Sequence, residues 1–283
     1  MEQLWSDLRL FREAFVGGAI AAGLLAFLGL HVVLRRIVFV GIALSQWAAV
    51  GIAFSFLAQS IALFDESHVL GVCRNHWVMA AVGEGLGLLL LLRGDERVVS
   101  REVRIGIGWA VAGALSVLFV AQSPVGMEEL KNLLTGEALF IDRSGLLLLG
   151  ATAALVLVPG SLFLARFLLV AFDRDLAVSL GVRVAVWDAL FYLLLGLTLA
   201  VTIHLVGVLF AVAFLVIPPA AALSLARRQW TLVLVSAGIG VGSWIAGFVL
   251  SHRLDLPVGH AAVAVAGLVF AVARGVRALR RGA

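Results

Sequence analysis

The stretch VAVWDALFYLLLGLTLAVTIHLVGVLFAVAFLVIPPAAALSL, from Val184 to Leu225, decides the fold class. It is apolar almost throughout, and about 20 residues of helix are enough to cross a hydrocarbon core about 30 Å thick. Only His204 and Gly207 mark a turn within it. The stretch therefore predicts two consecutive membrane spans, 184–203 and 205–225.

The whole chain has the composition of an integral membrane protein. Of its 283 residues, 63% are hydrophobic and 13% are charged, which excludes a water-soluble globular domain. Continuous apolar runs exclude an open sheet and a barrel. The prediction is an all-α, polytopic helical transmembrane protein of about nine (eight to nine) spans in a single domain, 1–283. The expected spans are 15–34, 37–63, 77–92, 105–121, 146–165, 184–203, 205–225, 230–250 and 258–273.

Lysine and arginine are concentrated in alternate loops. If segments 35–36, 93–104, 166–183, 227–228 and the C-terminal tail are cytoplasmic, they hold 15 of the 21 Lys and Arg residues. Cytoplasmic loops carry an excess of these residues, so the C-terminus is predicted to lie in the cytoplasm. The same topology explains the pI near 10.5 without a nucleic-acid partner.

Motifs for bond-making chemistry are missing from the sequence. Lys131 is the only lysine and follows Glu129 and Leu130, so there is no GxxxxGK[ST] phosphate cradle. Neither HExxH nor GxSxG occurs. The single cysteine, Cys73, excludes an intramolecular disulfide. We therefore expect that the chain binds no cofactor and hydrolyses no ATP itself.

The segment FDRDLAVSLGVRV, 172–184, is a short amphipathic stretch on the basic side of the membrane. It resembles the coupling helix of permeases of the zinc, manganese and iron(II) ABC importers, whose FDxxxAxxxGxxV-like pattern docks on the ATPase subunit. Acidic residues beside an AxxxG helix also suit a protein-docking surface, although a solvated loop is the plainer alternative. The residues expected to couple to the ATPase are Phe172, Asp173, Asp175, Ala177, Gly181 and Val184.

Four further segments resemble the same family in the same order. They are VVLRRIVFVG (32–41), LLTGEALFI (133–141), VGVLFAVAFLVIPPAAA (206–222) and LSHRLDLPVG (250–259). The resemblance implies a type II ABC importer permease of a bacterial inner membrane, which forms a homodimer around a path for zinc, manganese or iron. It also implies two cytosolic ATPase subunits, which bind ATP and magnesium, and an extracytoplasmic substrate-binding protein.

The second span departs from the family pattern. Permeases of this family carry a DALSH-like motif there, and its Asp and His lie four residues apart, on one helical face. The matching residues of this chain run from Ile42 to Gln46. Isoleucine cannot coordinate a metal, and a glutamine oxygen is a poor match to the ligand preferences of zinc. The ligands are therefore relocated, or the substrate is a hard cation, a chelate or a non-metal.

Intramembrane polar residues are the candidates for the path. Burying a carboxylate in lipid is costly, so Glu84 either faces a partner or water, or is an acid paired within the bundle. His204 lies near a turn, where an interfacial role is the alternative. Two adjacent prolines interrupt the hydrogen-bond ladder of their span, which predicts a kink. The path candidates are Ser45, Gln46, Gln59, Glu84, His204 and Pro218.

The loop FDESHVLGVCRNH, 64–76, gathers metal-ligand residue types in a spacing that follows no established site. An ion-collecting role and an ordinary polar loop are both open. The candidate metal ligands of the chain are Glu84, His204, His68 and His76. Two further functions also remain open: a transporter or channel that works without ATP, and a membrane enzyme with a novel site on Glu84 and His204.

Overall fold

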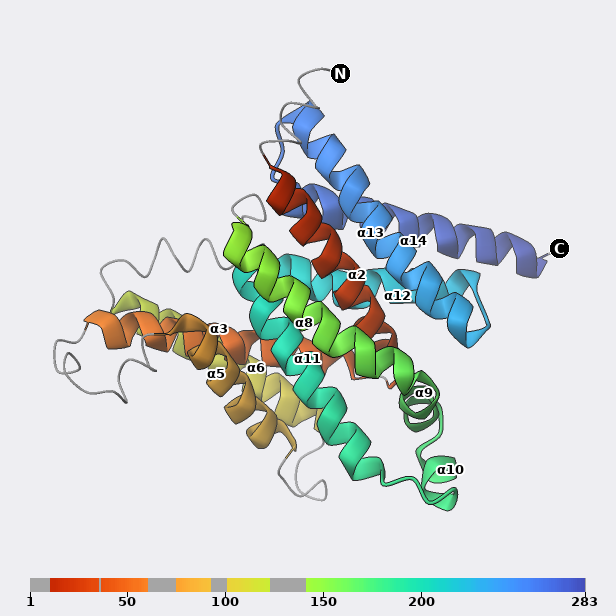
Figure 1. Cartoon of the computed structure of the whole chain (residues 1–283), viewed down its shortest axis with the longest axis horizontal. Coiled ribbons are helices and arrows are strands. Elements are labelled where there is room, and N and C mark those ends of the chain that lie inside the picture. The colour runs from red at the N-terminus through yellow and green to blue at the C-terminus, as the bar shows by residue number, and fades with distance from the viewer. Residues whose placement is uncertain (1–10, 36, 61–74, 93–100, 123–140, 283) are drawn as a thin grey trace.

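A computed structural model of the chain describes residues 11–35, 37–60, 75–92, 101–122 and 141–282. All the regular elements in these ranges are α-helices, as predicted (Figure 1). They are α2 (Arg12–Leu34), α3 (Val38–Ser60), α5 (His76–Leu92), α6 (Arg101–Ala121), α8 (Arg143–Leu162), α9 (Leu164–Phe172), α10 (Arg174–Ser179), α11 (Val184–Val206), α12 (Val208–Leu225), α13 (Gln229–Leu254) and α14 (Val258–Gly282).

Helix α2 is largely buried and packs against α12, α13 and α8. Small residues let its neighbours approach closely, which is how helices associate in lipid. Gly18 faces the indole of Trp244, whose Nε1 donates a hydrogen bond of 2.9 Å to the carbonyl oxygen of Phe15. Farther along, Ser236 Oγ donates to the carbonyl oxygen of Ala26 at 2.8 Å. These contacts hold α13 against α2 along much of its length.

Helices α3, α5 and α6 form a second group, which projects from the larger bundle in Figure 1. Two glycines set the spacing of α3 and α5. A methyl group built on Gly51 would lie 1.8 Å from the carbonyl oxygen of Met79, and one on Gly83 would lie 2.2 Å from that of Trp47. Helix α11 contacts both α5 and α3 as well as α8 and α12, so it joins this group to the rest of the bundle.

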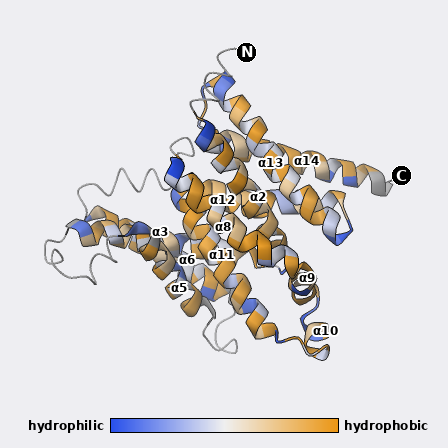
Figure 2. Ribbon diagram, viewed as in Figure 1, coloured by the Kyte–Doolittle hydropathy of each residue, from blue (hydrophilic) through white to orange (hydrophobic). Residues whose placement is uncertain are grey.

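Eight of the described helices are long and apolar enough to cross a membrane, and Val78–Leu90 is a shorter apolar helix. This agrees with the prediction of eight to nine spans. Figure 2 shows apolar residues along most of the helices, with hydrophilic ones gathered near helix ends. Gly207, at φ +85°, forms the turn between α11 and α12, as predicted.

Most helix ends lie a few residues from the predicted ones, and three differences change the assignment of a segment or a residue. Helix α14 continues to Gly282 instead of ending at 273, because its arginines lie on an amphipathic extension of the same helix. The basic segment after the fifth predicted span begins with α9, where a loop was expected, and continues into α10, the short helix that the resemblance implied. His204 lies in the last turn of α11 and not in the turn itself.

We predict that Gly51→Ala lowers the melting temperature of the purified protein in detergent, because its methyl group meets backbone that cannot move aside. Gly85→Ala on α5 is the matched control, since nothing lies within 4 Å of its built methyl group. Alanine is favoured over glycine in a helix by about 1 kcal/mol, so this control should leave stability unchanged or raise it. Equal melting temperatures for the two variants would contradict the close approach of α3 and α5.

Candidate functional site

The segment predicted to couple to an ATPase forms a short helix beyond the end of α11, at the edge of the molecule (Figure 1). Asp173 caps α10, and its carboxylate accepts a hydrogen bond of 2.9 Å from the backbone N–H of Leu176. Asp175 lies in the first turn, where a negative charge complements the helix dipole. Gly181 has φ +75°, a conformation that L side chains rarely adopt, and it redirects the chain into α11.

The same segment has a packed inner side and an exposed apolar outer side. Ala177 and Val184 are buried and form a small cluster with Val170. Phe172 is 55% exposed and Leu180 is 64% exposed. Leu176 and Val178 are exposed as well. Exposed apolar patches of this kind mark interaction surfaces, so the motif residues divide into those that hold the helix and those that could bind a partner.

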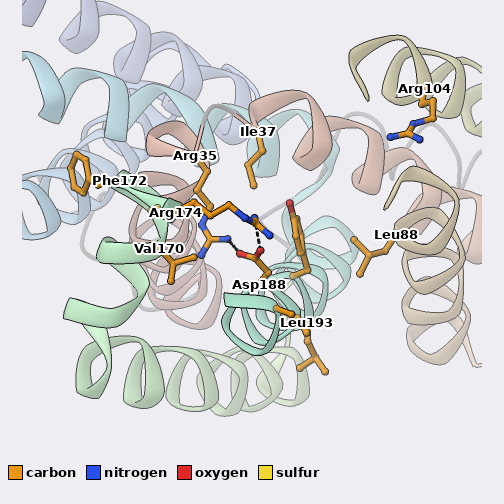
Figure 3. A pocket seen from close by; sticks show the side chains of 13 residues that line it. Arg35, Ile37, Leu88, Arg104, Val170, Phe172, Arg174, Asp188 and Leu193 are labelled. Atoms are coloured by element: carbon orange, nitrogen blue, oxygen red, sulfur yellow. Dashed lines mark hydrogen bonds and ion pairs between the residues drawn. The ribbon is translucent and has the colours of Figure 1, made fainter. Parts of the chain in front are cut away.

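An ion-pair triad fixes α10 to the bundle. Asp188 of α11 accepts hydrogen bonds from Arg35 Nη1 at 2.6 Å and from Arg174 Nη1 at 2.8 Å (Figure 3). Arg35 follows the C-terminus of α2, its side chain is 8% exposed, and its guanidinium lies 4.4 Å from the ring centre of Phe191. Asp188 therefore ties together α2, α10 and α11.

A pocket of about 760 Å³ adjoins this triad. Arg104 of α6 lies at its far edge in Figure 3, and Leu88 and Tyr192 also line it. Arg35, Arg104 and Arg174 come from three of the segments predicted to be cytoplasmic. If these segments lie on one side of the membrane, as predicted, their arginines are expected to lie near one another, and all three line this pocket.

The candidates of the second span do not form one cluster. Ser45 is fully buried, and its hydroxyl donates to the carbonyl oxygen of Ile42 in the preceding turn of α3. Gln46 is half-buried and approaches Gly113 of α6. Gln59 is exposed near the end of α3. Pro218 is buried within α12, which continues as a helix through it. The roles predicted for these residues in a path stay predictions.

Glu84 lies in the contact between α5 and α11. It is buried, and a methyl group built on Gly196 of α11 would lie 3.1 Å from its Oε2. Its Oε1 has no hydrogen-bond partner among the residues that the structure describes. A buried carboxylate is costly without a partner, so this position is suited to binding a cation or a proton.

One antiparallel register relates α5 to α11. His76 faces His204, Glu84 faces Gly196, and Leu88 lies with Tyr192 beside the arginine-lined pocket. Successive pairs are four or eight residues apart on each helix, so all lie on the facing sides. The structure thus places two of the predicted metal candidates together, and Glu84 in line with them. Hydropathy along the sequence could not reveal this line, because it locates the membrane spans but does not show which helix faces pack against each other.

His76 and His204 lie at the end of this line away from the pocket, with ring centres 6.1 Å apart. The third histidine candidate, His68, and most of its loop lie outside the described residues. Within the described ranges no group of three or more His, Cys, Asp or Glu side chains is placed to hold a metal ion.

At the start of α8, outside its span, Asp142 caps the helix. Its carboxylate accepts hydrogen bonds from Ser144 Oγ at 2.6 Å and from the backbone N–H of Gly145 at 2.8 Å. These bonds favour the charged form and lower the pKa of Asp142. The carboxylate of Asp142 therefore caps α8, and it lies outside the line of polar residues between α5 and α11.

Eight apolar helices of membrane-spanning length in the described ranges, with a buried carboxylate between two helices, are the features of a polytopic membrane protein, and the family match gives its class as a transport subunit. Residues 7–276 match the ABC 3 transport family, and the chain belongs to that family. The resemblance found in the sequence is therefore confirmed. So is the prediction of a transport subunit that is not itself an enzyme.

Known proteins of similar sequence and structure agree with this assignment. The chain is 27% identical to the manganese import system permease protein ScaB of Streptococcus parasanguinis, over 90% of this chain and 86% of that protein. It is 25% identical to the manganese transport system membrane protein MntC of Listeria innocua, over 87% and 83%. A chain of PsaBC from Streptococcus pneumoniae in complex with Fab shares the fold, with a TM-score of 0.83 and 22% identity over 96% and 95%.

We expect Asp188→Asn to lower the free energy of unfolding by roughly 3 kcal/mol, because it leaves the largely buried Arg35 without its counter-charge. Arg174→Gln should cost less than about 1 kcal/mol, since Arg174 is 65% exposed. Denaturant titration of the purified protein measures both. Asp175→Asn, on the exposed side of α10, is the control. An Asp188→Asn variant as stable as this control would show that the triad contributes nothing.

Proposed function

We propose that this chain is the permease subunit of an importer for a divalent metal ion, and that it couples to a separate ATPase through α10. The observation that carries the proposal is the set of exposed apolar side chains on and beside α10: Phe172, Leu176, Val178 and Leu180. These side chains lie beyond the N-terminal end of α11, and we place them outside the membrane, within reach of a soluble partner.

The ion-pair triad supports a coupling role for α10. A partner that moves α10 acts on Asp188 through Arg174, and Asp188 is bonded in turn to Arg35 at the end of α2. The short link at Gly181 connects α10 covalently to α11 as well. Movement of α10 therefore reaches two helices of the bundle at once.

The proposed substrate is a divalent metal ion. The relatives named for manganese import support this class, and the carboxylate of Glu84 and the imidazoles of His76 and His204 supply ligand types that such ions accept. Zinc, manganese and iron are all included. A second candidate substrate, a chelated or non-metal compound, is favoured by Ile42 and Gln46, which stand where metal ligands are expected.

The proposed assembly has two copies of this chain, two ATPase subunits that bind ATP and magnesium, and an extracytoplasmic binding protein that delivers the ion. We place the complex in a bacterial inner membrane with the C-terminus of this chain in the cytoplasm. The three arginines around the pocket support that orientation, because Lys and Arg favour the cytoplasmic side.

The test is ATP-dependent uptake by the reconstituted complex, measured with zinc, manganese and iron(II) in turn. We expect at least one ion to be taken up and to stimulate ATP hydrolysis. Uptake that persists without the ATPase would support an ATP-independent transporter or channel instead. Stimulation by none of the three ions would point to the chelated or non-metal substrate.

We predict that Leu180→Asp reduces the ATPase recovered with the tagged permease at least tenfold, because it places a charge in the exposed apolar surface. Gly181→Asp should act in the same direction by straining the turn. Leu254→Asp is the control: Leu254 is 59% exposed and lies at the opposite end of the protein in the proposed orientation. Equal recovery from all three variants would refute docking on α10.

We further expect Glu84→Gln to reduce uptake at least tenfold while the melting temperature stays the same or rises. The amide keeps the shape of the side chain but removes the charge that would attract a cation, and it relieves the cost of a buried acid. Wild-type uptake by this variant would show that Glu84 is a packing residue.

A further inference from the structure

The pocket beside the Asp188 triad carries an excess of positive charge. Both carboxylate oxygens of Asp188 are engaged, one by Arg35 Nη1 at 2.6 Å and the other by Arg174 Nη1 at 2.8 Å. One carboxylate therefore neutralises the charge of only one of these two guanidinium groups. Arg104 of α6 adds a third on the far side of the pocket (Figure 3). Among the described residues that line the pocket, Asp188 is the only acid.

Arg35 is buried with much of its hydrogen-bonding capacity unused. A guanidinium has five N–H donors, two on each Nη atom and one on Nε. The Nε and Nη2 atoms of Arg35 have no hydrogen-bond partner among the described residues, and only 8% of its side chain is exposed. A buried charge is costly unless it is neutralised by partners. The pocket therefore favours a further negative group beside the triad.

The lining of the pocket changes from charged to apolar along the membrane spans. The charged residues lie near helix ends: Arg35 follows α2, Arg104 is in the first turn of α6, and Asp188 is in the second turn of α11. Leu88 lies about one turn inside the end of α5, and Leu193 lies five residues beyond Asp188 and is 62% exposed. Five residues of helix span about 7.5 Å. The pocket is thus polar at the predicted membrane surface and apolar toward the middle of the spans.

We propose that this pocket binds the phosphate group of an anionic phospholipid, with the headgroup among the arginines and the acyl chains against Leu88 and Leu193. Arginine suits phosphate because its planar N–H groups match the phosphate oxygens. Basic pockets between membrane-spanning helices on the cytoplasmic side bind such headgroups. A free phosphate ion would satisfy the arginines equally but would leave the apolar walls uncovered, so we assign the ligand to lipid. The volume of about 760 Å³ is in the usual range of ligand sites.

A lipid in this pocket would connect the two groups of helices. Arg104 belongs to the group of α3, α5 and α6, whereas Arg35 and Arg174 lie at the end of α2 and on α10. A headgroup that fills the pocket contacts both sides and offsets their mutual repulsion. The site is separate from the transported ion, and it makes the position of α10 dependent on the lipid composition of the membrane.

The experiment titrates the full-length permease, purified in a non-ionic detergent and stripped of lipid, with dioctanoyl phosphatidylglycerol. Native mass spectrometry measures the bound lipid. We expect a saturable site that binds this lipid at least about tenfold more tightly than dioctanoyl phosphatidylcholine, because the choline group cancels the phosphate charge. The Arg104→Gln/Arg174→Gln variant should bind phosphatidylglycerol at least about tenfold more weakly than wild type, in line with the loss of charged hydrogen bonds.

The matched control is Arg183→Gln/Arg228→Gln. It removes the same charge from two exposed arginines that lie on the same predicted side of the membrane but do not line the pocket. This control should bind phosphatidylglycerol as wild type does. Inorganic phosphate is the second arm, and displacing the lipid should need at least about tenfold more of it, because each buried methylene of an acyl chain adds to the affinity.

Melting temperatures establish that each variant is folded. The proposal is overturned by the absence of a saturable site in wild type, by equal binding of phosphatidylcholine, or by equal binding in the two double variants. Inorganic phosphate as potent as the lipid would show a site for a free anion and refute the lipid assignment. A pocket that holds an acidic segment of a partner protein would instead show unchanged lipid binding but reduced recovery of the ATPase with Arg104→Gln/Arg174→Gln. The measurement uses neither ATP nor metal, so its outcome is separate from that of the proposed function.

Discussion

The structure depends on the close approach of helix backbones in lipid, where burying an apolar side chain against another helix gains little free energy. Lipid tails are as apolar as leucine, so helices associate through van der Waals packing and a few polar contacts. Gly18 accommodates Trp244, while Gly29 and Gly51 meet the backbones of Leu215 and Met79. Such contacts fix the register of neighbouring helices. Register in turn decides which polar side chains meet.

The sequence was sufficient for features that depend on local chemistry. Apolar length predicted the spans, and the positive φ of Gly207 belongs to the turn that was expected there. The short helix α10 was also predictable, because an Asp cap, a small buried residue at Ala177 and a glycine at 181 act within a few residues of one another. The end of α14 was not, since an amphipathic basic tail extends a helix without lengthening its apolar run.

The polar contacts between helices could not be predicted in the same way. Arg35 and Asp188 are 153 residues apart in the chain, and nothing in either apolar stretch states which faces meet. Helices that are apolar all round give no periodic signal for a buried side. Glu84 and His204 were therefore recognisable as unusual residues but not as parts of one line. That line appears only when Gly196 brings α11 against Glu84.

Helix α11 links the two ends of this line. At one end His204 faces His76, in the middle Gly196 faces Glu84, and at the other end Asp188 holds Arg35 and Arg174. The pocket at that end is lined by three arginines and one aspartate, so its net positive charge disfavours a cation, whereas the buried carboxylate in the middle of the helix disfavours an anion. Because α10 joins α11 at that same pocket, any movement of α10 acts through Arg174 on the end of α11 that carries Asp188.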